Sequence, residues 1–210
     1  MVNINMRNII AITGPSGVGK TTLGNNLVLN LNYKIPRHVT TRPRRPDDAT
    51  NFYRYLTHEE YRRLFEDNQF LISSGDGPAI DKQYGNFYGI LTADCIDAWE
   101  TNPTIIFFVS YKDIDRIEQL KTIGYPINLV NLTFQDIPKG VKYRLERDKS
   151  RNHTSQEIES RVNCAISDHA LYSDKLQACA SVTIFTDTCS IEQTYQTTCK
   201  ELKLIKSRGA

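Results

Sequence analysis

Residues 8–22 read NIIAITGPSGVGKTT and predict a strand, a tight turn and a helix in direct succession. The apolar, β-branched run over residues 8–13 is typical of a buried strand, and the Gly-Pro pair after it ends that strand. Apolar residues then recur at helical spacing over residues 20–31. Glycines spaced as G-x-x-x-x-G-K-[ST] allow successive backbone N–H groups to turn inward around a phosphate, and the following helix adds the positive end of its dipole. We therefore expect residues 14–21 to form a phosphate-binding loop.

Two side chains of this loop have predicted roles. Lys20 would reach the β and γ phosphates of a nucleoside triphosphate, and the hydroxyl of Thr21 would coordinate Mg²⁺. The residues expected to hold the nucleotide are Gly14, Ser16, Gly17, Val18, Gly19, Lys20, Thr21 and Thr22. A chance glycine turn is the alternative, but the strand before the loop and the helix after it supply the context that the motif requires.

The rest of the chain alternates strand and helix patterns. Short apolar runs are typical of strands, and residues 57–60 (THEE) have the spacing of a capping box at the start of a helix. The expected strands are 8–13, 51–56, 104–110, 127–134 and 181–185, and the last helix is expected at 190–204. Strands that alternate with helices indicate an α/β fold, with a largely parallel sheet flanked by helices on both faces.

Composition and charge exclude several classes of protein. The 210 residues include 26 Lys and Arg against 24 Asp and Glu, and the net charge of +2 is too small to attract nucleic acid or an acidic membrane by field alone. No apolar run has the length of a signal-peptide core or a membrane span. Five cysteines without a C-x-x-C pair fit a reducing compartment. We expect a cytoplasmic protein with no nucleic-acid partner and no membrane partner.

Two stretches interrupt this pattern, over residues 39–55 and 144–152. Both are rich in charge and poor in apolar residues, so we expect them to contribute little to the core and to be candidates for mobile segments that close over a ligand. The first stretch contains Arg42, Arg44 and Arg45. Guanidiniums this close repel one another unless they are solvated or share an anion, so a solvated basic loop is the alternative to anion binding.

Taken in order, the motifs resemble those of the guanylate kinase family along nearly the whole chain. The matching segments are 14–22, 40–43 with Arg45, 52–55, 57–61, 85–89, 144–146, 157–161 and, loosely, 182–187. The phosphate loop occurs in many families, whereas T-T-R-P, F-Y-R-Y and G-N-F-Y-G in this order are specific. The resemblance implies an ATP-dependent P-loop kinase that uses Mg²⁺ and acts on a small phosphorylated acceptor.

The resemblance also implies how the chain is organised. We expect one domain over residues 1–210, as a monomer or a homodimer, with a core, a small acceptor-binding insert and a lid. The expected ranges are 1–35, 90–140 and 165–210 for the core, about 36–89 for the insert and about 141–164 for the lid.

Four residues match by position those that hold the phosphate of the acceptor in that family. They are Arg42, Arg45, Tyr53 and Tyr88. Each residue type suits this role, since guanidinium forks pair with phosphate oxygens and phenol hydroxyls donate to them.

Further arginines resemble the lid arginines that neutralise charge on the transferring phosphoryl group. They are Arg144, Arg161 and one or both of Arg147 and Arg151. For Arg147 and Arg151 the alternative is ordinary charge on a helix surface, because the spacing in this region differs from the family pattern.

The chain departs from the family where the guanine base is recognised. The residues at these three places are His38, Ile72 and Ile90, where family members have a serine, a glutamate and a serine or threonine. An apolar Ile72 cannot accept hydrogen bonds from the N1–H and amino groups of guanine, so the usual base recognition is missing. His38 is still predicted to contact the acceptor by its position.

Carboxylates are also missing at the end of a strand. Phe108 and Ser110 occupy the positions where the family has acidic residues. Asp113 and Asp115 follow shortly afterwards, and either could substitute in positioning water or a metal ion.

Three functions are compatible with this pattern. The first is phosphorylation of a nucleoside monophosphate, which the resemblance indicates to be GMP. In this case an insertion at residues 74–83 would replace the lost glutamate through Asp76 or Asp81. The alternative is that this insertion is an idle surface loop. The second is phosphorylation of a phosphosugar, because the chain is also similar to ribose 1,5-bisphosphate kinases, which lack the guanine-reading residues. The third is a catalytically weak binding module, which the retained Lys20 and Thr21 disfavour. The extent of the resemblance ranks the nucleotide first.

Overall fold

The computed structural model describes residues 7–45, 48, 52–73, 85–147 and 153–204. In chain order the elements are β1 (Asn8–Thr13), α1 (Lys20–Leu31), β2 (His38–Thr40), β3 (Tyr53–Tyr55), α2 (His58–Glu66), β4 (Phe70–Ser73), β5 (Tyr88–Leu91), α3 (Thr92–Thr101), β6 (Thr104–Phe108), the 3₁₀ helix η2 (Tyr111–Asp113), α4 (Ile114–Thr122), β7 (Ile127–Thr133), α5 (Ile137–Arg147), α6 (Ser155–Cys179), β8 (Val182–Phe185) and α7 (Ile191–Glu201). Within the described residues the strands form two four-stranded sheets.

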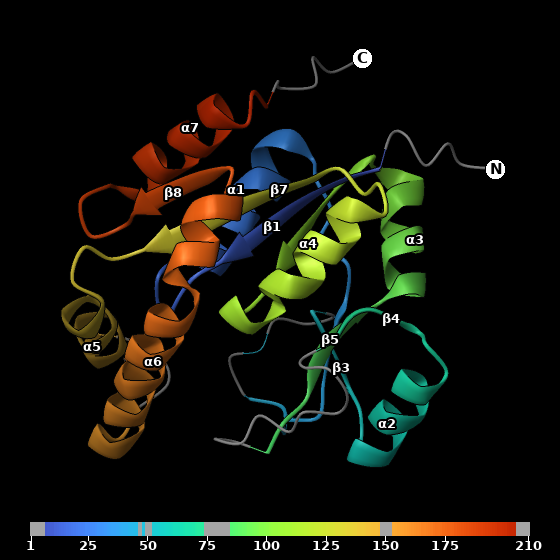
Figure 1. Cartoon of the computed structure of the whole chain (residues 1–210), viewed down its shortest axis with the longest axis horizontal. Helices are drawn as coiled ribbons and strands as arrows, with labels where there is room; N and C mark the ends of the chain where they lie inside the picture. The colour runs from blue at the N-terminus through green and yellow to red at the C-terminus, as the bar shows by residue number, and fades with distance from the viewer. Residues whose placement is uncertain (1–6, 46–47, 49–51, 74–84, 148–152, 205–210) are drawn as a thin grey trace.

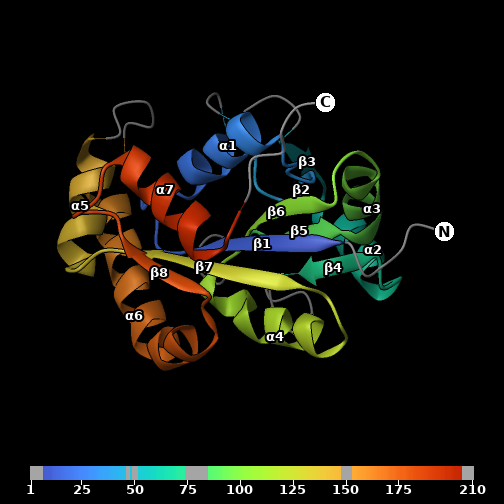
Figure 2. The ribbon, with the colours of Figure 1, turned by 90° about the horizontal axis from the view of Figure 1, so that it is seen from above.

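The central sheet has the strand order β6-β1-β7-β8, and every pairing in it is parallel. Successive residues of β1 point to opposite faces, so Ile9 and Ala11 enter one half of the core while Ile10 and Ile12 enter the other. Helices α4 and α6 cover the first face, and α1 and α7 cover the second (Figure 1, Figure 2). Burial on both faces explains why β1 is almost entirely apolar.

The strand order reverses at β1. Strand β6 lies on one side of β1, and β7, the next strand along the chain, lies on the other. In open parallel sheets, ligands bind beyond the carboxyl ends of the strands at such a reversal. The segment that joins β1 to α1 leaves the sheet at this point, so the predicted phosphate-binding loop lies at the expected ligand crevice.

The second sheet has the order β3-β2-β5-β4 and lies below the central sheet in the view of Figure 1. Strands β2 and β3 are parallel, whereas β5 is antiparallel to both of its neighbours. Helix α2 packs against this sheet and begins at a capping box in which Thr57 and Glu60 satisfy each other's backbone N–H groups. Its buried Tyr61 joins Val39 and Phe87 in a small separate core.

The predicted α/β class, with a parallel sheet flanked by helices, is confirmed. The strands predicted at 8–13, 104–110, 127–134 and 181–185 are β1, β6, β7 and β8, and the predicted last helix is α7. The expectation that residues 39–55 contribute little to the core is wrong at the start of that stretch. Val39 and Thr40 are completely buried because they belong to β2, an inner strand of the second sheet.

The second charged stretch also contributes to the core, since Leu145 is buried against the α1 face of the sheet. Residues 148–152 lie outside the described residues. Helix α6 runs unbroken across the boundary expected near residue 164, because it contains neither glycine nor proline after its capping box. No helix in the described ranges combines the length and the apolar character needed to cross a membrane. The division into core, insert and lid stays a prediction.

Candidate functional site

The loop after β1 has a backbone shape that requires its glycines. Gly14, Gly17 and Gly19 have positive φ angles of 143°, 74° and 103°. Space excludes a side chain at Gly14 as well, because a Cβ there would lie 2.1 Å from the carbonyl oxygen of Leu132. Val18 is 2% exposed and anchors the loop in the core. The backbone therefore has the glycine-dependent conformation expected of the predicted phosphate-binding loop.

Lys20 begins α1 and folds back over this loop. Its Nζ donates to the carbonyl oxygens of Gly14 at 2.7 Å and Pro15 at 3.0 Å. Burial lowers the pKa of Lys20 to about 8, and a phosphate placed beside the amine would favour its charged form. Thr21 and Thr22 are exposed on the first turn of α1. That helix has no side-chain cap, so its first backbone N–H groups are available to a ligand.

Two of the predicted lid arginines lie against the loop. Arg161, on α6, donates from Nη1 to the hydroxyl of Ser16 at 3.4 Å. Arg144, on α5, lies beside Gly17, where an added Cβ would be 3.0 Å from the Cβ of Arg144. The Arg144 guanidinium donates to the carbonyl oxygen of Thr186 at 3.4 Å. Positive charge therefore borders the loop from two helices.

The structure does not bring Arg147, another predicted lid arginine, to the loop. Arg147 is exposed, hydrogen-bonds to the hydroxyl of Tyr143 and lies over its ring, with 5.2 Å between the guanidinium carbon and the ring centroid. Arg151 lies outside the described residues.

Three of the predicted phosphate-holding residues, Arg42, Tyr53 and Tyr88, lie on one face of the second sheet. Tyr53 and Tyr55 are two positions apart on β3, so their side chains point the same way. Tyr55 is paired in register with Thr40 of β2, which is paired in turn with Tyr88 of β5. The guanidinium of Arg42 lies over the rings of Tyr53 and Tyr55, at 4.7 and 5.9 Å from their centroids.

An acidic residue completes this cluster. Arg42 is 5% exposed and forms a bidentate ion pair with Asp48, with N–O distances of 2.5 and 2.7 Å. Asp48 also accepts from the backbone N–H of Arg45 at 2.7 Å and from the hydroxyl of Tyr55 at 2.6 Å. Hydrogen bonds from Arg42 hold the pKa of Asp48 well below its usual range, against the opposite effect of burial.

His38 uses both ring nitrogens within the protein. Nε2 accepts from the backbone N–H of Phe108 at 3.2 Å, so Nδ1 carries the proton and donates to the carbonyl oxygen of Pro36 at 3.0 Å. The ring stacks on Phe52, with 5.1 Å between centroids. Burial lowers the pKa of His38 to about 4, so the ring is neutral at physiological pH. This side chain joins β2 to β6, and its contact with the acceptor stays a prediction.

The other two guanine-reading positions are also part of the core. Ile72 is 3% exposed and Ile90 is 2% exposed, and the two are paired in register between β4 and β5. Asp76 and Asp81 of the insertion lie outside the described residues.

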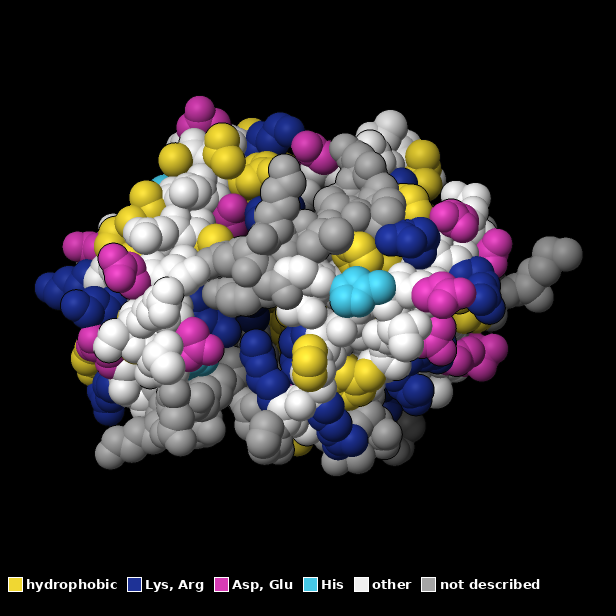
Figure 3. Space-filling view, turned by 90° about the horizontal axis from the view of Figure 1, so that it is seen from below, with side chains coloured by type: hydrophobic (Ala, Val, Ile, Leu, Met, Phe, Trp, Pro, Cys, Tyr) yellow, Lys and Arg dark blue, Asp and Glu magenta, His cyan; other side chains and the backbone are white. Residues whose placement is uncertain are grey.

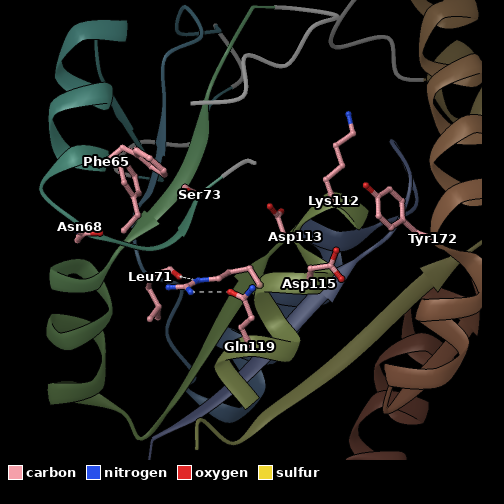
Figure 4. Close-up of a pocket in the computed structure, with 11 residues that line it drawn as sticks. Phe65, Asn68, Leu71, Ser73, Lys112, Asp113, Asp115, Gln119 and Tyr172 are labelled. Atoms are coloured by element: carbon pink, nitrogen blue, oxygen red, sulfur yellow. Dashed lines mark hydrogen bonds between the residues drawn. The ribbon is translucent and has the colours of Figure 1, made fainter. Parts of the chain in front are cut away.

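A cavity of about 590 Å³ opens between β4, the start of α4 and α6 (Figure 4). Asp113 points into it from η2, next to Lys112. The Oδ2 atom of Asp113 accepts from the backbone N–H and the hydroxyl of Ser110 at 2.7 and 2.9 Å. The Oδ1 atom of Asp113 has no hydrogen-bond partner among the described residues. Burial raises the pKa of the Asp113 carboxyl group to about 6. Asp115 is exposed and paired with Lys175, whereas Asp113 is buried and keeps one carboxylate oxygen without a hydrogen-bond partner among the described residues.

The donor set fits Mg²⁺ that arrives with a nucleotide. No group of three or more His, Cys, Asp or Glu side chains in the described part of the chain could hold a metal ion alone. Mg²⁺ in phosphoryl-transfer sites commonly takes few protein ligands, and water and substrate phosphates supply the rest. The exposed hydroxyl of Thr21 suits that arrangement.

Figure 3 shows how charge is distributed around this region. Lys and Arg side chains gather around a hollow in the middle of the face drawn there. A hollow bordered by one sign of charge raises the local concentration of ligands of the opposite sign. This face therefore suits anionic ligands, although the net charge of the whole chain is small.

Sequence comparison relates the chain to guanylate kinases. It is 24% identical over 151 residues to the guanylate kinase of Bartonella henselae, and the match covers 71% of this chain and 62% of that protein. It is 30% identical over 99 residues to the guanylate kinase of Mycoplasmopsis pulmonis and 32% identical over 103 residues to that of Salinibacter ruber. The structure is similar to the crystal structure of guanylate kinase from Anaplasma phagocytophilum, with a TM-score of 0.64 over 97% of this chain and 88% of that chain. The chain is therefore similar to guanylate kinases in sequence and in fold.

The extent of this similarity is limited. The guanylate kinase-like chain spans 62%, 47% and 51% of the lengths of the Bartonella, Mycoplasmopsis and Salinibacter proteins, and the last two matches cover 46% and 48% of this chain. The structural match has 16% sequence identity and shows the fold alone. No protein-family model matches the chain.

The sequence analysis did not predict two residues of the candidate site. Asp48 and Tyr55 lie in the acceptor cluster beside Arg42. A signal for Asp48 was present, because three neighbouring arginines need an anion and acidic residues follow them directly. Tyr55 could have been found from strand alternation, because it lies two residues after Tyr53 and therefore on the same face of the strand.

Proposed function

We propose that this guanylate kinase-like chain transfers the γ-phosphoryl group of ATP to a small phosphorylated acceptor, a nucleoside monophosphate such as GMP. The observation that carries the proposal is the glycine loop at the carboxyl end of β1, with Lys20 folded over it. Relatives that are guanylate kinases support the same reaction.

The ATP site in this proposal consists of the loop and its two bordering helices. Phosphate oxygens would replace the carbonyl oxygens of Gly14 and Pro15 as partners of Lys20. The first N–H groups of α1 would donate to them as well. Arg161, already in contact with Ser16, and Arg144 beside Gly17 would offset the negative charge of the transferring group. Mg²⁺, held by Thr21 and the phosphates, would supply further charge neutralisation.

The acceptor site in this proposal is the Arg42 cluster on the second sheet. Arg42 would bind the acceptor phosphate as a fork, and Tyr53 and Tyr88 would donate from their hydroxyls. An oxygen of that phosphate would bond to the γ phosphorus as the bond to the β–γ bridging oxygen breaks, and ADP would leave. An ionised phosphate oxygen is already a nucleophile, so the reaction needs no general base. Positioning and charge neutralisation account for catalysis.

One observation favours a second acceptor, a phosphosugar such as ribose 1,5-bisphosphate. The three positions that read guanine in the family have no polar group available here, because His38 is hydrogen-bonded to backbone and Ile72 and Ile90 are buried. An acceptor without a base needs none of these contacts.

The setting of the reaction is part of the proposal. All five cysteines are free thiols, which fits a reducing compartment such as the cytoplasm. The proposal includes a small-molecule acceptor and either a monomer or a homodimer.

Replacement of Arg42 tests the acceptor site. Arg42→Ala should lower kcat/KM for the acceptor by about 100-fold, equivalent to a loss of roughly 3 kcal/mol for a charged hydrogen-bonded pair. The Kd for ATP should change little, because the phosphate loop is formed by other elements. Steady-state kinetics and ATP titration measure both quantities. Arg44→Ala is the matched control, because Arg44 is exposed in the same arginine run. A fall in ATP affinity with an unchanged acceptor KM would show that Arg42 serves the nucleotide instead.

A further inference from the structure

The proposed acceptor site already contains an anion that belongs to the chain. Both carboxylate oxygens of Asp48 accept from the guanidinium fork of Arg42, at 2.5 and 2.7 Å. The Oδ2 atom also accepts from the backbone N–H of Arg45 at 2.7 Å and from the hydroxyl of Tyr55 at 2.6 Å. Four donors therefore converge on one carboxylate, whose side chain is 7% exposed.

These donors suit a phosphate as well as they suit a carboxylate. A guanidinium fork binds either group through two parallel hydrogen bonds, and a backbone N–H or a phenol hydroxyl donates to either. The two outer N–H groups of Arg42 cannot serve a phosphate and Asp48 at the same time. Binding of one anion to the fork therefore excludes the other.

We propose that Asp48 is a specificity-determining residue of the acceptor site, an internal anion that the acceptor phosphate must displace from Arg42. The inference rests on the proposed function, because it takes Arg42 to be the residue that holds this phosphate. The chemical class it selects is a phosphomonoester, whose dianion attracts a guanidinium more strongly than a carboxylate monoanion does. A phosphodiester carries a single charge and gains too little to displace Asp48.

Asp48 and phosphate compete strongly for Arg42 because Arg42 is buried. Arg42 is 5% exposed, and removing the partner of a buried charge without replacement is costly. An arriving phosphate supplies that replacement, while the displaced carboxylate is solvated by water. The apparent affinity for phosphate equals the intrinsic affinity multiplied by the fraction of molecules in which Asp48 has left the fork. If about one molecule in ten is open, the internal anion weakens phosphate binding by about tenfold.

Calorimetric titration of the full chain tests the proposal with inorganic phosphate as the dianionic probe and dimethyl phosphate as the monoanionic probe, at mildly alkaline pH. Asp48→Asn removes the competing charge and keeps the shape of the side chain. We expect Asp48→Asn to bind inorganic phosphate about tenfold more tightly than the natural sequence does. We also expect it to gain measurable affinity for dimethyl phosphate.

Three further variants locate the effect. Tyr55→Phe removes one donor from Asp48 and leaves the carboxylate in place, so it should tighten phosphate binding by a smaller factor, and it carries the test if Asp48→Asn does not fold. Asp174→Asn, at an exposed position on α6, should leave affinity unchanged. Adding Arg42→Ala to Asp48→Asn should abolish the gain, which separates this site from phosphate bound at the Lys20 loop.

The direction of the change in phosphate affinity tests the inference about Asp48. If Asp48→Asn and Tyr55→Phe bind phosphate as the natural sequence does, or more weakly, Asp48 merely positions Arg42 and the inference is overturned. A gain that survives Arg42→Ala overturns it as well. The proposed function is judged separately by turnover with ATP. Turnover without any change in phosphate affinity rejects the internal anion alone, and a change in affinity without turnover rejects the kinase reaction alone.

Discussion

Arg161 and Arg147 have the same side chain on neighbouring helices but different surroundings. Arg161 contacts Ser16 of the phosphate loop, whereas Arg147 is exposed and lies over Tyr143 on its own helix. Arg161→Ala should therefore lower kcat by about 100-fold, the loss typical of removing one donor from a developing charge. Arg147→Ala should lower it far less. Single-turnover kinetics with saturating ATP compares the two variants, and equal losses would mean that Arg147 also reaches the transferring phosphoryl group.

Residues of the phosphate loop could be predicted from the sequence because their contacts are local. Gly14 and Lys20 lie within one short motif, and spacing alone identifies the turn that they form. The surroundings of His38 could not be predicted in this way. Its partner Phe108 is 70 residues away, and only the packing of β2 against the end of β6 brings the two together. Asp48 is close to Arg42 in sequence, but its side chain is also held by the hydroxyl of Tyr55 on β3.

At the scale of single elements, α2 depends on its capping box. Thr57 accepts from the backbone N–H of Glu60, and Glu60 accepts in return from the backbone N–H of Thr57. Thr57→Ala should lower the free energy of unfolding by about 1 kcal/mol, the usual cost of losing such a cap. Urea unfolding measures this change. Thr122→Ala, at the last residue of α4, is the control with little expected effect. Equal stability of Thr57→Ala and the natural sequence would show that tertiary packing alone holds α2.

Elements with strong local signals were predicted, and elements without them were not. Strands β1, β6 and β7 are largely apolar because both of their faces are buried. Strands β2, β4 and β5 have three or four residues each, and their pairing joins segments up to about 50 residues apart. A pattern this short does not distinguish a strand from a loop. Of the second sheet, only β3 was predicted, within the strand expected at residues 51–56. The pairing of this sheet, which carries the Arg42 cluster, follows only from the folded chain.

At the scale of the whole molecule, the fold brings the two proposed anion-binding regions into one structure. The phosphate loop lies at the strand reversal of the central sheet, and the Arg42 cluster lies on the second sheet. The order of motifs along the chain predicted this arrangement through its resemblance to guanylate kinases. The identity of the acceptor could not be predicted, because His38, Ile72 and Ile90 replace the residues that would read a guanine base.

A coupled ADP-release assay tests the central claim of phosphoryl transfer most directly. The full chain is incubated with Mg·ATP and, in turn, GMP, dGMP, AMP, UMP, CMP and ribose 1,5-bisphosphate, and Lys20→Ala serves as the blank. We predict acceptor-dependent ADP release with GMP or dGMP that Lys20→Ala abolishes. Turnover with the sugar alone would move the chain to the phosphosugar kinases. Binding of ATP without ADP release for any acceptor would contradict the claim that the chain is a kinase for a phosphorylated acceptor.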